Sequence, residues 1–118
     1  MMRSLVHGIG LALLLGTGVA WAQLPDNAVW IDVRTPGEYA EGHLEGAKLI
    51  PFDGIEAGIN ELDLAKDTPI YLYCGSGGRS EVAKQALERK GYTQVTNVGG
   101  LSDALELTGQ ETPTKPNP

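Results

Sequence analysis

Residues 73–80 read Tyr-Cys-Gly-Ser-Gly-Gly-Arg-Ser, a glycine-rich segment that joins two strongly patterned stretches of the chain. Before it, residues 70–73 form an apolar and aromatic run that predicts a buried strand. After it, residues 80–90 repeat apolar side chains at helical spacing, and Gly91 is well placed to end that helix. The segment is therefore expected to form the turn between a strand and a helix.

The same alternation of strand and helix patterns extends along the rest of the chain. Strands are predicted at residues 29–33, 49–50, 70–73 and 94–98, and helices at 36–41, 53–64, 80–90 and 101–107. This order predicts the α/β class: a single domain with a mostly parallel central sheet and helices on both faces. Ligands of such sheets bind beyond the carboxyl ends of the strands, and Cys74 falls at that place.

The start of the first helix carries a local signal of its own. Thr35 is the expected N-cap, and Pro36 suits the first helical position. Glu38 stands three residues after Thr35, which is the spacing of a capping box. Gly42 interrupts the pattern, so this helix is expected to be short.

Both ends of the chain differ in composition from the domain of residues 23–110. Residues 1–22 combine Arg3, an apolar run and the small-x-small sequence Ala20-Trp21-Ala22, which is the layout of a secretory signal peptide. We expect cleavage after Ala22 and a periplasmic location in a Gram-negative bacterium; an uncleaved anchor is the alternative. Three prolines among residues 112–118 predict a disordered tail over residues 111–118.

The charge balance restricts the classes of partner. The formal net charge is −6, and the acidic residues are scattered along the sequence. A negative, evenly charged surface disfavours nucleic acid and anionic membrane as partners. No set of His, Cys and acidic residues has metal-ligand spacing, so neither a metal nor a cofactor is predicted.

Cys74 is the only cysteine, so it cannot form an intramolecular disulfide. A lone thiol in an oxidising compartment is exposed to damage, which favours a chemical use for it. A buried inert cysteine and an intermolecular disulfide are the alternatives.

The glycine-rich segment has a composition suited to activating that thiol. Glycine accepts positive φ without steric cost, so the backbone can curl with its N–H groups facing inward. The start of the following helix adds the positive end of its dipole. An ordinary thiol is only about 3% ionised at pH 7, and such surroundings lower its pKa. We expect Cys74 to be an accessible thiolate and Arg79 to donate two hydrogen bonds to an oxyanion. The alternative is a glycine-rich turn that contains a cysteine without a function.

The segment resembles the active-site loop of the rhodanese family, Cys-x-x-Gly-x-Arg-Ser/Thr, which Gly77, Arg79 and Ser80 match. The resemblance continues on both sides of the loop and covers about residues 29–107. It rests on Trp-Ile-Asp-Val-Arg at 30–34, Glu-Tyr at 38–39, Gly-His-Leu-Glu-Gly-Ala at 42–47, Gly-Tyr at 91–92 and Val-Gly-Gly-Leu at 98–101. The chain is most similar in layout to short, exported, single-domain rhodaneses.

The resemblance implies a thiosulfate sulfurtransferase in which Cys74 is the catalytic residue and carries sulfur as a persulfide. It implies a small anionic sulfur donor, a cyanide or thiol acceptor and no cofactor, with a protein sulfur acceptor as a further partner. The substrate-binding residues would be Gly75, Ser76, Gly77, Gly78 and Arg79.

Two other functions are alternatives for a loop of this kind. A persulfide carrier or sensor would bind a protein partner without turnover, and a phosphatase would hydrolyse phosphate esters. Related phosphatases have a longer Cys-x5-Arg loop, whereas this chain has Cys-x4-Arg, which favours sulfur transfer. Asp32, Arg34 and His43 are interpreted as structural residues.

Overall fold

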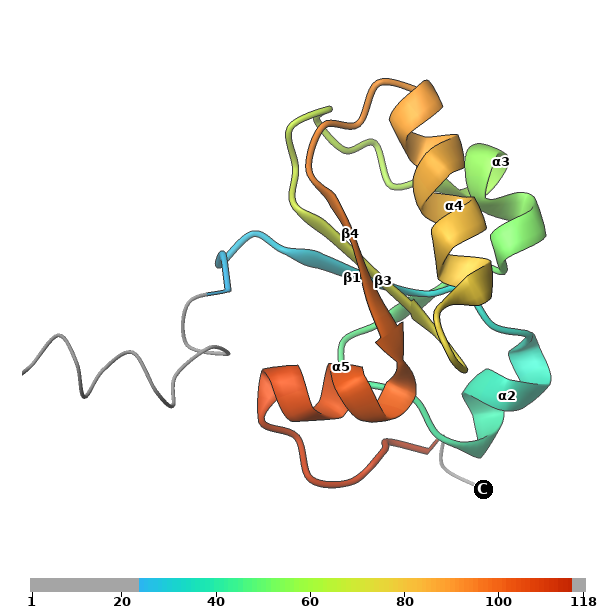
Figure 1. The fold of residues 1–118 in the computed structure, drawn as a ribbon, viewed down its shortest axis with the longest axis vertical. Helices are drawn as coiled ribbons and strands as arrows, with labels where there is room; N and C mark the ends of the chain where they lie inside the picture. The colour runs from blue at the N-terminus through green and yellow to red at the C-terminus, as the bar shows by residue number, and fades with distance from the viewer. Residues whose placement is uncertain (1–23, 116–118) are drawn as a thin grey trace, which may run out of the picture.

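The computed structural model describes residues 24–115. Four parallel strands form one sheet in the order β2-β1-β3-β4. Their bounds are β1 Val29–Asp32, β2 Lys48–Leu49, β3 Ile70–Cys74 and β4 Val95–Gly100. Helices lie on both faces of this sheet (Figure 1), so the predicted α/β class is confirmed.

The helices form two layers. α3 and α4 pack on one face of the sheet, whereas α5 packs on the other (Figure 1). The bounds are α2 Pro36–Glu41, α3 Ile55–Asn60, α4 Gly78–Arg89 and α5 Leu101–Thr108, with a 3₁₀ turn η2 at Phe52–Gly54. α3 ends at Asn60 rather than at residue 64, and α4 begins two residues earlier than the sequence pattern predicted.

The capping box predicted for the first helix is present. The Thr35 side chain accepts a hydrogen bond from the Glu38 backbone N–H, and the Glu38 carboxylate accepts one from the Thr35 backbone N–H. α2 ends before Gly42, whose φ of 148° lies in the region that favours glycine. The local sequence therefore fixes both ends of this short helix.

Strand β3 lies between β1 and β4 and decides where the only cysteine points. Alternate residues of a strand face the same side of the sheet, so Ile70, Leu72 and Cys74 share one face. All three belong to the buried cluster that also contains residues of α3 and α4. Tyr73 belongs instead to the cluster on the α5 side. The Cys74 side chain is thus directed into the α3–α4 layer.

Residues 111–115 of the predicted tail make a backbone contact with the domain. Thr114 forms an isolated antiparallel bridge with His43, and each donates a backbone hydrogen bond to the other. Residues 1–23 and 116–118, which include the predicted signal peptide, lie outside the described part. Within residues 24–115, no helix has the length and apolar character needed to cross a bilayer.

Candidate functional site

Cys74 is the last residue of β3, and α4 begins only four residues later at Gly78. The turn between them is made by Gly77, which is the N-cap of α4 and has a φ of 106°. Of the three glycines predicted to curl this loop, Gly77 is the one with positive φ; Gly75 and Gly78 have negative φ. One left-handed residue is therefore enough to reverse the chain and bring the start of α4 over the cysteine.

The loop directs hydrogen-bond donors at the sulfur. The Gly77 N–H donates to the Cys74 Sγ at 2.9 Å. Burial raises the pKa of the Cys74 thiol, but the side chain and backbone of Ser80 and the backbone N–H groups of Gly77 and Ser76 outweigh it. Together they lower the pKa of Cys74 to about 7. The expected low pKa follows from these donors at the amino end of α4.

Ser80 was not among the predicted site residues. Its side chain is fully buried, and the hydroxyl oxygen has no hydrogen-bond partner of ordinary geometry among the described residues. The hydroxyl still lies close enough to the sulfur to lower the pKa of Cys74. Because a hydroxyl rotates, ionisation of the thiol would give it an acceptor. The signal was present in the sequence, since Ser80 directly follows Arg79 in the loop pattern.

The expectation that Cys74 is accessible is wrong for this structure: the residue is 1% exposed. The apolar α3–α4 layer lies on one side of the side chain, and the donor groups of the loop lie on the other. The Arg79 side chain lies beside this loop, because its Nη2 atom is 3.3 Å from the point where a Cβ on Gly75 would stand. The sulfur is thus ionisable but covered.

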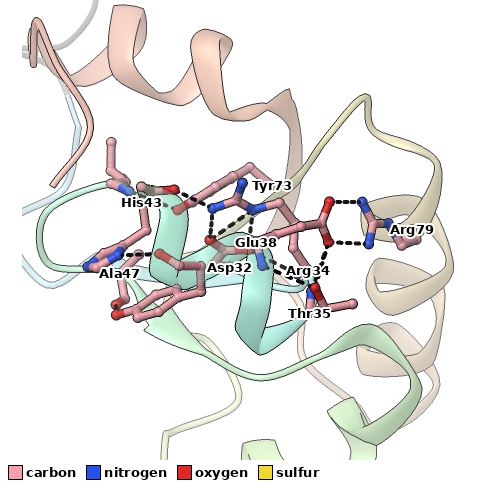
Figure 2. Close-up of polar contacts among 11 residues, drawn as sticks. Asp32, Arg34, Thr35, Glu38, His43, Ala47, Tyr73 and Arg79 are labelled. Carbon is pink, nitrogen blue, oxygen red and sulfur yellow. Dashed lines mark hydrogen bonds and ion pairs between the residues drawn. The ribbon is translucent and has the colours of Figure 1, made fainter. Parts of the chain in front are cut away.

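Arg79 is paired with the carboxylate of Glu38, a residue of the capping box of α2. Its Nη1 and Nη2 atoms donate to the two carboxylate oxygens of Glu38 at 2.8 and 3.1 Å (Figure 2). The Arg79 hydrogen bond is the main reason that the pKa of Glu38 falls to about 2. Glu38 lies on α2, 41 residues before Arg79 in the chain, so no local pattern could have predicted the pair.

Strand β4 supports the loop from the side. The register between β3 and β4 shifts after Leu72, and Asn97 at this irregularity turns its side chain toward the loop. The Asn97 Nδ2 atom donates to the Gly77 carbonyl oxygen at 3.0 Å. Gly100 packs so closely that an added Cβ would collide with the Gly75 carbonyl oxygen. The absence of a side chain at Gly100 thus leaves room for the loop.

Asp32 and Arg34, which were interpreted as structural residues, form a buried ion pair at the end of the first strand. Arg34 Nε and Nη2 donate to the Asp32 carboxylate at 2.7–3.1 Å, and Nη2 also donates to the Gly42 carbonyl oxygen (Figure 2). His43 stacks on Tyr39, with ring centroids 3.7 Å apart. These contacts fit the structural roles predicted for Asp32, Arg34 and His43. None of these contacts involves the Cys74 sulfur.

Two features define the class of protein: a four-stranded parallel α/β domain, and a lone cysteine in a loop of amide donors at the end of its central strand. The family model described as rhodanese-like domain matches residues 18–106. The chain therefore belongs to the rhodanese family, and the resemblance seen in its sequence is confirmed.

Two named relatives and one solved structure are similar to this chain. The thiosulfate sulfurtransferase PspE of Escherichia coli K12 is 40% identical over 74 residues, which cover 63% of this chain and 71% of PspE. A protein of Allochromatium vinosum named sulfurtransferase is 35% identical over 75 residues, 64% of this chain and 68% of that protein. A solved structure described as rhodanese with anions from E. coli has a TM-score of 0.62 at 39% identity, covering 64% of this chain and 89% of its own. These relatives support sulfur transfer as the general activity.

Proposed function

We propose that this protein moves sulfane sulfur from thiosulfate to cyanide or a thiol through a persulfide on Cys74. The single observation that carries the proposal is the hydrogen bond from the Gly77 N–H to the Cys74 sulfur, in a loop that lowers the pKa of this thiol to about 7. At neutral pH about half of the molecules would hold the nucleophilic thiolate. The similarity to a thiosulfate sulfurtransferase supports thiosulfate as the donor.

The proposed reaction has two displacements at sulfur. In the first, the Cys74 thiolate attacks the outer sulfur of thiosulfate, a new S–S bond forms, and sulfite leaves with the electron pair of the broken bond. In the second, cyanide or a thiolate attacks the terminal sulfur of the persulfide. Thiocyanate or an acceptor persulfide forms, and the Cys74 thiolate is restored. Both steps conserve charge, and neither needs an external oxidant or a cofactor.

The loop would supply the binding energy for these anions. Backbone N–H groups of the loop, at Gly75, Ser76, Gly77 and Gly78, would hold the persulfide and the donor, and Arg79 would hold the sulfonate end of thiosulfate. The first N–H groups of a helix have no partner within the helix, so those of α4 are available to an anion. Thiolate and persulfide differ by one sulfur atom, so the second sulfur would occupy the space inside this ring of donors.

The test is the intact mass of the purified protein after treatment with thiosulfate, together with the rate of thiocyanate production. One added sulfur on the native chain and none on Cys74→Ser is the expected result, with continuous thiocyanate release by the native chain alone. A native chain that acquires no sulfur would refute the proposed reaction. A circular dichroism spectrum of the serine variant checks that its fold is unchanged.

A persulfide carrier or sensor is the second candidate, and the 1% exposure of Cys74 favours it. A covered sulfur could accept a sulfur atom and release it only when a protein partner opens the loop. Such a protein would gain one sulfur per chain and release little thiocyanate. The ratio of thiocyanate formed to protein present, measured over an hour, separates the candidates.

We also propose that the chain is exported to the periplasm and loses residues 1–22, on the sequence pattern of this segment. Expression of the full chain in a Gram-negative host, followed by osmotic release and intact mass, tests this. The expected mass is that of a chain whose first residue is Gln23. An uncleaved chain retained with the membranes would contradict the proposal.

A further inference from the structure

The guanidinium proposed to receive the donor anion is already bound by a carboxylate. Both terminal nitrogens of Arg79 donate to Glu38, in a two-point contact at 2.8 and 3.1 Å (Figure 2). The Arg79 side chain is 32% exposed and that of Glu38 is 37% exposed. The pair therefore lies where a small anion in solution can reach it and compete with the carboxylate.

The same guanidinium lies beside the loop that holds the sulfur. Its Nη2 atom is beside Gly75, and Cys74 beneath the loop is 1% exposed. Hydrogen bonding to Glu38 raises the pKa of Arg79, and the charge of the nearby Cys74 sulfur adds to the increase. Glu38 thus anchors, from α2, a side chain of α4 that lies beside the loop holding the sulfur.

A second arginine near this edge of the sheet, Arg34, is not available to bind the donor anion. Arg34 is 7% exposed and is held on two sides by the Asp32 carboxylate and the Gly42 carbonyl oxygen. Each of the two guanidinium groups is therefore neutralised by an internal carboxylate. Thiosulfate carries two negative charges. At the loop it would meet the backbone N–H donors and an Arg79 that is already bound by Glu38.

We propose that Glu38 is a specificity-determining residue that competes with the donor for Arg79 and disfavours dianionic sulfur donors. The inference rests on the proposed function and adds the charge of the preferred donor. By Coulomb's law a fixed carboxylate repels a dianion about twice as strongly as a monoanion at the same place. The carboxylate therefore lowers the affinity for thiosulfate more than it lowers the affinity for a sulfane sulfur donor with a single negative charge.

Glu38→Gln is the informative substitution, because glutamine also serves the third position of a capping box and keeps α2 intact. Glu41→Gln is the matched control: Glu41 is an exposed residue of the same helix, and the change removes the same charge. Both variants are assayed with thiosulfate, a dianion, and with benzenethiosulfonate, a monoanion that also carries a transferable outer sulfur. Cyanide is the common acceptor.

Glu38→Gln is expected to raise kcat/KM for thiosulfate roughly two- to fivefold through a lower KM, the range for loss of a partly exposed ion pair. The gain for benzenethiosulfonate is expected to be smaller, about the square root of that factor. Glu41→Gln should change neither donor. An unchanged or higher KM for thiosulfate in Glu38→Gln, or an equal gain for both donors, overturns the proposal.

Alkylation of Cys74 by neutral iodoacetamide separates this inference from the proposed function, because it needs no sulfur donor. In Glu38→Gln the limiting rate at high pH should rise, since Arg79 is no longer held beside the loop that encloses the sulfur. An unchanged limiting rate overturns the role of Glu38 in holding Arg79 there even if the native enzyme transfers sulfur. A native chain that transfers no sulfur from either donor would refute the proposed function, and the limiting rate would still test this role of Glu38.

Discussion

Replacement of Ser80 by alanine isolates the contribution of one hydroxyl to the reactivity of Cys74. Ser80 is fully buried, and its hydroxyl has no other hydrogen-bond partner among the described residues. The substitution therefore removes one oxygen atom and leaves no buried donor or acceptor unpaired. Among the groups that lower the pKa of Cys74, the Ser80 side chain is the largest contributor.

The size of the effect follows from the energy of a hydrogen bond to a charged group, about 1.5–3 kcal/mol. We take the lower end, because the hydroxyl is not yet aligned with the sulfur in the resting structure. One pKa unit corresponds to about 1.4 kcal/mol, so the pKa of Cys74 should rise from about 7 to about 8 in Ser80→Ala. The thiolate fraction at pH 7 then falls from about one half to about one tenth, a roughly fivefold loss.

The assay is the rate of iodoacetamide alkylation of Cys74 from pH 5.5 to 10. For both proteins the rate rises with pH to a plateau, and only the midpoint should differ. Ser102→Ala, an exposed serine on α5, is the control and should keep a midpoint near pH 7. A midpoint in Ser80→Ala that equals the native one would refute the assigned role of the hydroxyl. A loss of equal size at every pH would show a change in access instead of ionisation.

Three further predictions concern the frame around the loop. Gly78→Ala should stabilise the fold by about 0.5–1 kcal/mol and keep the native alkylation profile, because Gly78 starts α4 with negative φ and a Cβ would meet no atom within 4 Å. Gly100→Ala should destabilise by about 1–3 kcal/mol and raise the alkylation midpoint, since its methyl group would displace the Gly75 carbonyl. Asp32→Asn should cost about 3–5 kcal/mol, because it leaves the buried Arg34 without a counter-charge. Urea unfolding measures the three stabilities, provided that the m-value is unchanged. A urea midpoint equal to the native one in Gly100→Ala or Asp32→Asn would contradict the contacts described for Gly100 and Asp32.

The fold could be predicted because its signals are local. Strand and helix periodicity gave the order of the elements, and the capping box at Thr35 and Glu38 marked the start of α2 to the residue. The start of α4 was placed two residues late, because the pattern of apolar side chains begins only after the first turn. Gly77 caps that helix through its backbone conformation, without a side-chain signal. The bridge between Thr114 and the distant His43 is a contact that no local pattern reports.

The site was predictable only where its members are adjacent in the chain. The loop from Cys74 to Arg79 could be recognised as an anion-binding turn, whereas the pairing of Arg79 with Glu38 could not. The local pattern around Glu38 indicates helix capping and carries no signal for a contact with a residue far along the chain. Its two carboxylate oxygens serve both purposes, since Oε1 accepts from Thr35 and from Arg79.

The burial of Cys74 supports a chemical role more than exposure alone would. A structural cysteine in apolar surroundings has a raised pKa, and burial acts in that direction here as well. The pKa is nevertheless lowered to about 7, so the donors of the loop more than compensate for the cost of burying charge. An inert cysteine would need no donors, and the Gly77 N–H would be left to solvent. The same donors would stabilise a persulfide anion, while the cover over the sulfur would keep competing oxidants away from it.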